Sequence, residues 1–112
     1  MRIYKILPRA EWSAAESCGR FAGSGIDVAD GYIHFSTAAQ AAETARRHFA
    51  GQRDLVVLAV EADDLGAALR WEPSRGGDLF PHLYAALDAG AVRQVTEAPL
   101  GADGTPELGA LT

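Results

Sequence analysis

Apolar and polar residues follow a helical period in two parts of the chain. Alanines at helical spacing predict one helix over residues 9–18 and a second that begins after Thr37 and buries an alanine-rich stripe. Thr37 and Gln40 have the spacing of a capping box, and Gly51 is the type of residue expected just past the end of a helix. These two segments are therefore expected to be the main helices.

Short apolar runs rich in β-branched and aromatic residues predict six strands, over residues 2–7, 31–35, 55–60, 69–72, 80–84 and 92–97. The run at 55–60 is apolar throughout, which is typical of a central strand buried on both faces. Pro81 has no backbone N–H to donate, so it is expected in an edge strand or at a strand start.

The remaining segments read as connections. Residues 19–30 contain three glycines and two aspartates and predict a loop, and residues 101–112 predict a loose tail. Strands outnumber helices and do not alternate strictly with them, which favours the α+β class. We expect one domain over residues 1–112, with its core in about the first 100 residues.

Composition narrows the classes of partner. The chain has 112 residues and a net charge of −5, without the basic surface that duplex nucleic acid requires. It has no apolar run of membrane-spanning length and no signal-peptide pattern, so a cytoplasmic protein with no membrane partner is expected. The lone Cys18 is expected to be a small buried side chain, and zinc-ligand spacing is absent, so no metal is expected.

Candidate chemistry begins on the predicted strand at 31–35. Side chains alternate along a strand, so Tyr32, His34 and Ser36 share one face while Ile33 and Phe35 point to the core. The polar face precedes a helix N-terminus, whose free N–H groups favour an anion. The alternative interpretation is a structural histidine bound to a backbone carbonyl, with Ser36 or Thr37 merely capping the helix.

A similar arrangement occurs on the predicted strand at 80–84. There His82 and Tyr84 share a face, and the two polar faces would line one cleft if the strands meet. Trp71 and Glu72 precede Arg75, whose guanidinium suits a phosphate and which two glycines follow. The alternatives are an ordinary glycine-rich turn and partly buried rings that backbone groups satisfy.

Several blocks together resemble a known family. They are Ile3-Tyr4-Lys5-Ile6, Asp30 to Thr37, Phe49 to Gln52, Leu69 to Glu72, Arg75 to Gly77 and Leu79 to Tyr84. In this order they resemble the bacterial family called domain of unknown function 952, over about the first 100 residues. The fold of that family resembles ADP-ribosyltransferases, which implies a split, mostly antiparallel sheet, two main helices and a cleft for NAD as co-substrate.

The resemblance also implies roles for particular residues. His34 and Ser36 match the element that holds the adenosine-side ribose, and His82 or Tyr84 would pack on the nicotinamide. His34 and His82 are the expected catalytic residues; the expected ligand-binding residues are Tyr32, Ser36, Trp71, Glu72, Arg75 and Tyr84. The glutamate that often binds the other ribose has no counterpart in the matched blocks, although Glu97 lies in a predicted late strand.

Three functions remain open at this point. The first is a protein that binds NAD or a related nucleotide and transfers ADP-ribose, or phosphate as in branches that use histidines and arginines. The second is a non-catalytic module for a small anionic metabolite or a protein partner. The third is general acid–base catalysis by His34 and His82. A carboxylate in the cleft, such as Glu72 or Glu97, would favour an enzyme.

Overall fold

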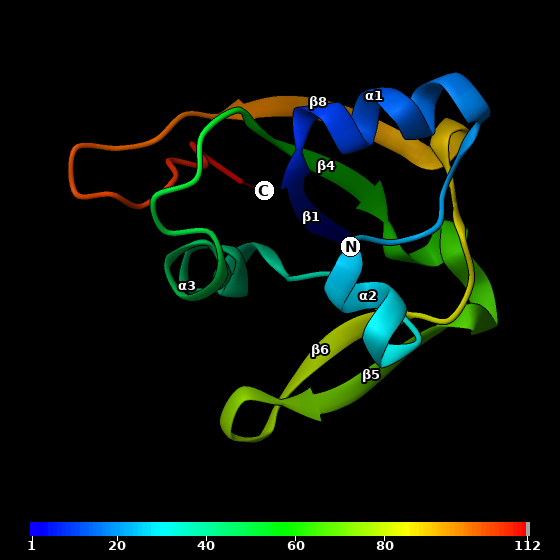
Figure 1. Ribbon diagram of the computed structural model, residues 1–112. Helices are drawn as coiled ribbons and strands as arrows, with labels where there is room; N and C mark the ends of the chain where they lie inside the picture. Colours follow the sequence, from blue (N-terminus) through cyan, green and yellow to red (C-terminus); the bar gives the residue numbers. More distant parts are fainter. Residues whose placement is uncertain (112) are drawn as a thin grey trace.

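Three small antiparallel sheets organise the chain, as the computed structural model in Figure 1 shows. The model describes residues 1–111, with Arg75 described by its backbone alone. The first sheet contains β1 (Arg2–Pro8), β4 (Leu55–Glu61) and β8 (Val92–Ala98), with β4 in the centre. The second sheet pairs β2 (Arg20–Phe21) with β7 (Leu87–Asp88). The third sheet contains β3 (Ile33–His34), β6 (Asp78–Leu83) and β5 (Leu69–Ser74), with β6 in the centre. All pairings are antiparallel, which confirms the α+β class.

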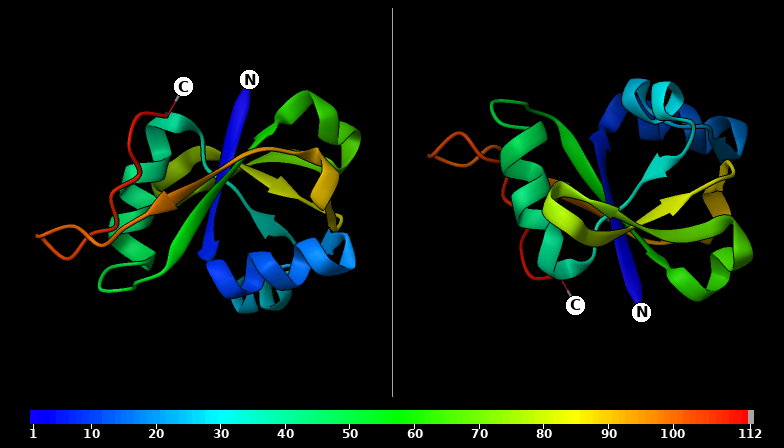
Figure 2. Two further views of the ribbon diagram at one scale, coloured as in Figure 1. Left: turned by 90° about the horizontal axis from the view of Figure 1, so that it is seen from above. Right: turned by 90° about the horizontal axis from the view of Figure 1, so that it is seen from below.

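Helices lie on both sides of β1. The α-helices are α1 (Arg9–Cys18), α2 (Gly25–Asp30) and α3 (Ala38–His48), and the short 3₁₀ segments are η1 (Ala62–Ala68), η2 (Arg75–Gly77) and η3 (Ala89–Ala91). In both views of Figure 2, β1 runs between α3 on one side and α1 with α2 on the other. In the described residues, no helix combines the length and the apolar character needed to cross a membrane.

The core forms on both faces of the first sheet. From Leu55 to Val60 the side chains of β4 are all buried, and they alternate between two apolar clusters. Val56 and Leu58 pack in the cluster that includes Trp12 of α1, whereas Val57 packs in the cluster beneath α3. The prediction of a central strand buried on both faces is confirmed.

The two main helices form as predicted, and a local signal fixes the start of the second. The Thr37 hydroxyl accepts a hydrogen bond from the Gln40 amide at 3.2 Å, and the Thr37 amide donates to the Gln40 side chain at 3.0 Å. This reciprocal pair satisfies two N–H groups that a helix end leaves free. Because the helix begins directly after Thr37, α3 follows closely on the strand that carries His34.

The expected loop at residues 19–30 is wrong, because this segment contains β2 and α2. The Ser24 amide donates to the Asp27 carboxylate at 2.8 Å, which stabilises the first turn of α2. Gly31, at φ 88°, ends the helix in a left-handed conformation that glycine adopts without strain. A six-residue helix between glycines is too short to show a clear apolar period.

Two further expectations need correction. Pro81 lies in the central strand β6, not at an edge. This is tolerated because β3 pairs only with His82 and Leu83, and the Pro81 carbonyl, which proline retains, accepts from the Phe35 amide at 3.0 Å. Cys18 is exposed, because the buried face of α1 carries Trp12 and Ala15 instead.

The buried first sheet makes a direct prediction about stability. We expect Leu58→Ala to lower the free energy of unfolding by about 2–5 kcal/mol, because it leaves a cavity in a fully buried position. The matched control is Leu79→Ala, at a half-exposed position, which we expect to change stability by less than about 0.5 kcal/mol. Urea unfolding of both variants measures the difference, and equal losses would contradict this placement of the core.

Candidate functional site

The two histidines predicted from the sequence are direct neighbours. His34 of β3 pairs with His82 of β6 in the strand register, and their ring centroids lie 5.5 Å apart. Tyr32 stacks on His82 at 4.1 Å and lies 4.6 Å from His34, and Tyr84 lies 5.2 Å from Tyr32. The polar faces of the two strands therefore meet in one ring cluster, formed by Tyr32, His34, His82 and Tyr84.

Asp27 of α2 anchors this cluster from below the surface. Its side chain is 1% exposed. Lys5 Nζ donates to its two oxygens at 2.8 and 3.1 Å, and the amides of Ser24 and His34 donate at 2.8 and 3.1 Å. The His34 ring adds a fifth contact through Nδ1 at 2.6 Å. Burial would raise the pKa of Asp27, but the hydrogen bonds from His34 and the charge and hydrogen bonds of Lys5 outweigh it and lower the pKa to about 2.

Lys5 is the buried partner of this carboxylate. Its side chain lies on β1 and is 6% exposed. Burial lowers the pKa of Lys5, while the charge of Asp27 opposes this effect. An ion pair buried so deeply is costly to form but very costly to break, because removing either partner leaves an unpaired charge. Lys5 and Asp27 therefore act as one unit.

His34 lies between two carboxylates. Nδ1 contacts Asp27 at 2.6 Å, and Nε2 contacts the more exposed Asp30 at 3.0 Å. Both ring nitrogens therefore face carboxylate oxygens, and this arrangement fixes the plane of the imidazole.

His82 has a carboxylate partner of its own. Its Nδ1 lies 2.8 Å from Glu72 Oε1, which also accepts a hydrogen bond from the Tyr84 hydroxyl at 2.7 Å. The Tyr84 and His82 contacts lower the pKa of Glu72, and the bond to Glu72 raises the pKa of Tyr84. The Arg70 guanidinium lies 4.4 Å above the Tyr84 ring, a cation–π contact that closes this end of the cluster.

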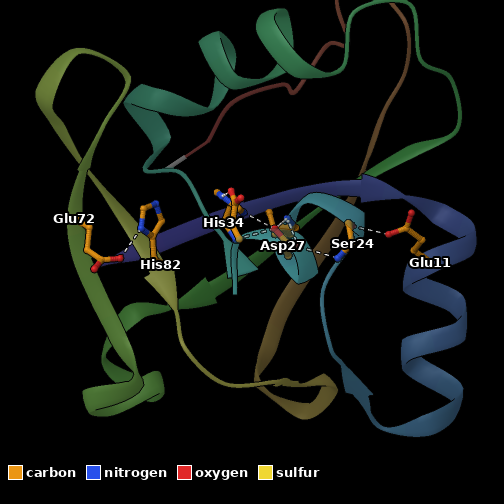
Figure 3. A network of polar contacts seen from close by, with 8 residues as sticks. Glu11, Ser24, Asp27, His34, Glu72 and His82 are labelled. Atoms are coloured by element: carbon orange, nitrogen blue, oxygen red, sulfur yellow. Dashed lines mark hydrogen bonds and ion pairs between the residues drawn. The ribbon is translucent and has the colours of Figure 1, made fainter. Parts of the chain in front are cut away.

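A cavity of about 590 Å³ opens beside the two histidines. It is lined by β1, the starts of α1 and α2, the residues from β3 to the start of α3, the C-terminal half of α3 and the β5–β6 hairpin. Its basic side chains are Lys5, His34, Arg47, His48 and His82, and the one carboxylate in the described lining is that of Glu11. Figure 3 shows the polar contacts of these residues and their neighbours, with Glu72 and His82 at one end, His34, Asp27 and Ser24 between, and Glu11 at the other end.

Six of the predicted site residues form two groups. His34, His82 and Ser36 line the cavity, and the Ser36 hydroxyl lies 2.9 Å from that of Thr44. Tyr32, Glu72 and Tyr84 are not in the described lining. Tyr32 and Glu72 contact the histidines, and Tyr84 contacts Tyr32 and Glu72.

Three residues discussed with the predicted site stand apart from these groups. Trp71 pairs with Pro81, so it lies on the face of β5 opposite to Glu72. The side chain of Arg75 lies outside the described part of the structure. Glu97, the late-strand acid, is absent from the described lining and pairs with Arg9 at 2.6 Å.

Sequence reasoning missed four residues of the site: Lys5, Glu11, Asp27 and Arg47. Signals were available for two of them. Ser24 and Asp27 have the spacing of a helix start. Lys5 is the single lysine and lies within an otherwise apolar strand, which is an unusual place for an exposed charge. For Glu11 and Arg47 nothing in the local pattern distinguishes them from charges on a solvated helix face.

The Asp27 network predicts how stability depends on pH. The folded pKa of Asp27 lies below its ordinary value of 3.8, so the carboxylate stabilises the fold above about pH 4, and this contribution of about 2 kcal/mol is lost as the pH falls toward 2. We expect Asp27→Asn to remove this acid-dependent step and to cost about 3–5 kcal/mol at neutral pH, because Lys5 loses its partner. Urea unfolding at pH 7, 4 and 2 measures both effects.

Two variants control this experiment. Asp30→Asn removes the exposed carboxylate on the other side of His34 and should change stability by less than about 1 kcal/mol. Combining Lys5→Met with Asp27→Asn removes both buried charges and should recover part of the loss. If Asp30→Asn and Asp27→Asn lowered the free energy of unfolding equally, the larger contribution assigned to the buried Asp27 carboxylate would be contradicted.

Comparison with known proteins identifies relatives of this chain. The model of the family described as protein of unknown function (DUF952) matches residues 6–95. The crystal structure of protein CC0527 from Caulobacter crescentus is 56% identical, with a TM-score of 0.95 over 97% of this chain and 96% of that one. Its solution NMR structure is also 56% identical, with a TM-score of 0.87 over 96% and 93% of the two chains. No curated protein matches the chain. The chain belongs to the DUF952 family.

Proposed function

We propose that the cavity binds NAD or a related nucleotide and that the protein transfers ADP-ribose from it. The observation that carries this proposal is the pairing of His34 with His82 beside a cavity that contains both hydroxyl and cationic groups. A volume of about 590 Å³ falls within the ordinary range of small-molecule sites. The resemblance of the family fold to ADP-ribosyltransferases adds to the proposal as an analogy.

Ribose recognition would fall to Ser36 and to His34, whose Nε2 contact with the exposed Asp30 a sugar hydroxyl can replace. Both residues line the cavity. Thr44 donates to the Gln40 carbonyl at 3.2 Å, so Ser36 donates to Thr44, and the oxygen of Ser36 can still accept a hydrogen bond from a sugar hydroxyl. Because Asp27 holds the imidazole in place, little rotational freedom would be lost on binding.

Phosphate recognition would fall to Arg47 and His48 at the end of α3. Both line the cavity, and the Arg47 side chain is 49% exposed. Its present partner is Glu43, a surface contact that a phosphate can replace at small cost. Lys5 is unsuited to this role, because both oxygens of Asp27 already hold its ammonium group.

The transfer step requires a broken glycosidic bond. The bond between C1′ of the ribose and the nicotinamide nitrogen breaks, and its electron pair leaves with nicotinamide. The resulting oxocarbenium carbon is attacked by a lone pair of water or of another acceptor, which then loses a proton. A rigid cavity contributes to such a step by holding the reacting groups in position and by stabilising the developing positive charge.

The second candidate is a module that binds a small anion without catalysis. The two acids considered as catalytic carboxylates from the sequence favour this candidate, because both have partners elsewhere. Glu72 contacts His82 and Tyr84, and Glu97 pairs with Arg9. Neither lines the cavity. Acid–base catalysis by the histidine pair is less well supported, because both ring nitrogens of His34 already contact carboxylates.

An amide NMR titration with NAD, ADP-ribose, AMP and glutathione tests the proposal. We expect shifts near His34, Ser36, Arg47 and His82 with NAD and ADP-ribose, and His34→Ala should weaken binding by about tenfold or more. Trp71→Ala is the matched control, because its ring lies on the opposite face of β5 and binding should not change. Shifts with glutathione alone, or unchanged affinity in His34→Ala, would show that this site assignment is wrong.

If nucleotide binding is found, incubation with NAD distinguishes the two candidates. Release of nicotinamide supports transfer, whereas tight binding without release supports the non-catalytic module.

A further inference from the structure

Glu11 is the one acid among the described residues that line the cavity, and the Lys5 charge that attracts it is already paired with Asp27. Its Oε1 accepts a hydrogen bond from the Ser24 hydroxyl at 2.6 Å, and Glu11 forms no ion pair with any other described residue. A neutral hydroxyl orients a carboxylate without cancelling its charge. Glu11 is only half-buried, so a ligand in the cavity can reach its carboxylate.

The carboxylates that contact the two histidines each have a cationic or potentially cationic partner. Lys5 and His34 hold Asp27, His34 also contacts Asp30, and His82 contacts Glu72. The position of Glu11 is also distinctive, since Figure 3 places it at the opposite end of the polar network from His82. Glu11 therefore contributes the negative charge of the described lining that no ion pair holds, whereas His34, Arg47, His48 and His82 contribute basic groups.

We propose that Glu11 makes the cavity selective for a ligand with a positive charge at one end and phosphates along its length. This proposal rests on the proposed function and specifies it further. Oxidised NAD has this charge pattern, because its nicotinamide ring is cationic, whereas the ring of the reduced form is neutral. An unpaired carboxylate attracts the cationic ring electrostatically and gains nothing comparable from the neutral one.

This charge pattern also gives the ligand a direction in the cavity. The cationic ring would lie toward Glu11, and the phosphates would lie toward the basic groups of α3 and β3. Such an orientation differs from the family resemblance, which places His82 or Tyr84 against the nicotinamide. Electrostatics favours the Glu11 end, because this carboxylate attracts a ring with positive charge.

Glu11→Gln tests the proposal with three ligands. The amide keeps the size of the side chain and can still accept the hydrogen bond from Ser24, but it removes the charge. By calorimetry at constant salt, we expect the wild-type protein to bind oxidised NAD about tenfold more tightly than reduced NAD. The variant should lose most of this preference by binding oxidised NAD more weakly, while its affinity for ADP-ribose, which lacks the ring, stays unchanged.

Glu16→Gln is the matched control, since Glu16 is an exposed acid on the same helix and its change alters the net charge equally. It should preserve the preference for oxidised NAD. An unchanged preference in Glu11→Gln, or an equal loss of affinity for ADP-ribose, would overturn the role of Glu11 and leave nucleotide binding intact. If the wild-type protein binds none of the three ligands, the proposed function itself fails, and the role of Glu11 fails with it.

Discussion

The buried Asp27 carboxylate determines how the candidate site is built, because groups from three separate segments converge on it. The ammonium group of Lys5 comes from β1, an amide from the start of α2, and an amide and a ring nitrogen from His34 of β3. A carboxylate removed from water needs this many donors to remain ionised. The contacts to Asp27 therefore join β1 of the first sheet to β3 of the third, although the two strands belong to no common ladder in the described structure. Gly23 contributes space, since a Cβ there would lie 2.8 Å from that of Asp27.

The orientation of the histidines follows from this anchor. With Nδ1 of His34 fixed on Asp27, the ring lies beside Tyr32, which in turn stacks on His82. Glu72 then fixes His82 from the neighbouring strand β5. Each imidazole is thus held by a carboxylate on a different element, and the aromatic contacts fill the space between them. Side chains held in this way are already arranged for binding, which reduces the entropy lost when a ligand arrives.

Features carried by local periodicity were predictable from the sequence, and features created by distant contacts were not. The apolar run of β4, the capping box of α3 and the shared face of Tyr32 and His34 all depend on neighbouring residues, and all are present. The pairing of Lys5 with Asp27 joins residues 22 positions apart, and Asp27 lies in the segment that was expected to be a loop. Side-chain alternation predicted correctly that the polar faces of the two histidine strands would meet if the strands paired. The pairing of β3 with β6 itself depends on contacts between distant residues, which local alternation does not predict.

Net charge is a poor guide to what this cavity attracts, because most charges are already paired. The chain carries a net charge of −5, yet the cavity lining contains five basic side chains and one acid. What matters is which charges a ligand can reach and displace. Lys5 is locked in a buried pair, whereas Arg47 shares Glu43 with Arg46 at the surface, where an incoming phosphate can substitute for the carboxylate. The charges that a ligand can reach are therefore those of exchangeable surface pairs and of groups without an ion pair. These charges, and not the net charge of the chain, determine the kind of ligand that the cavity can bind.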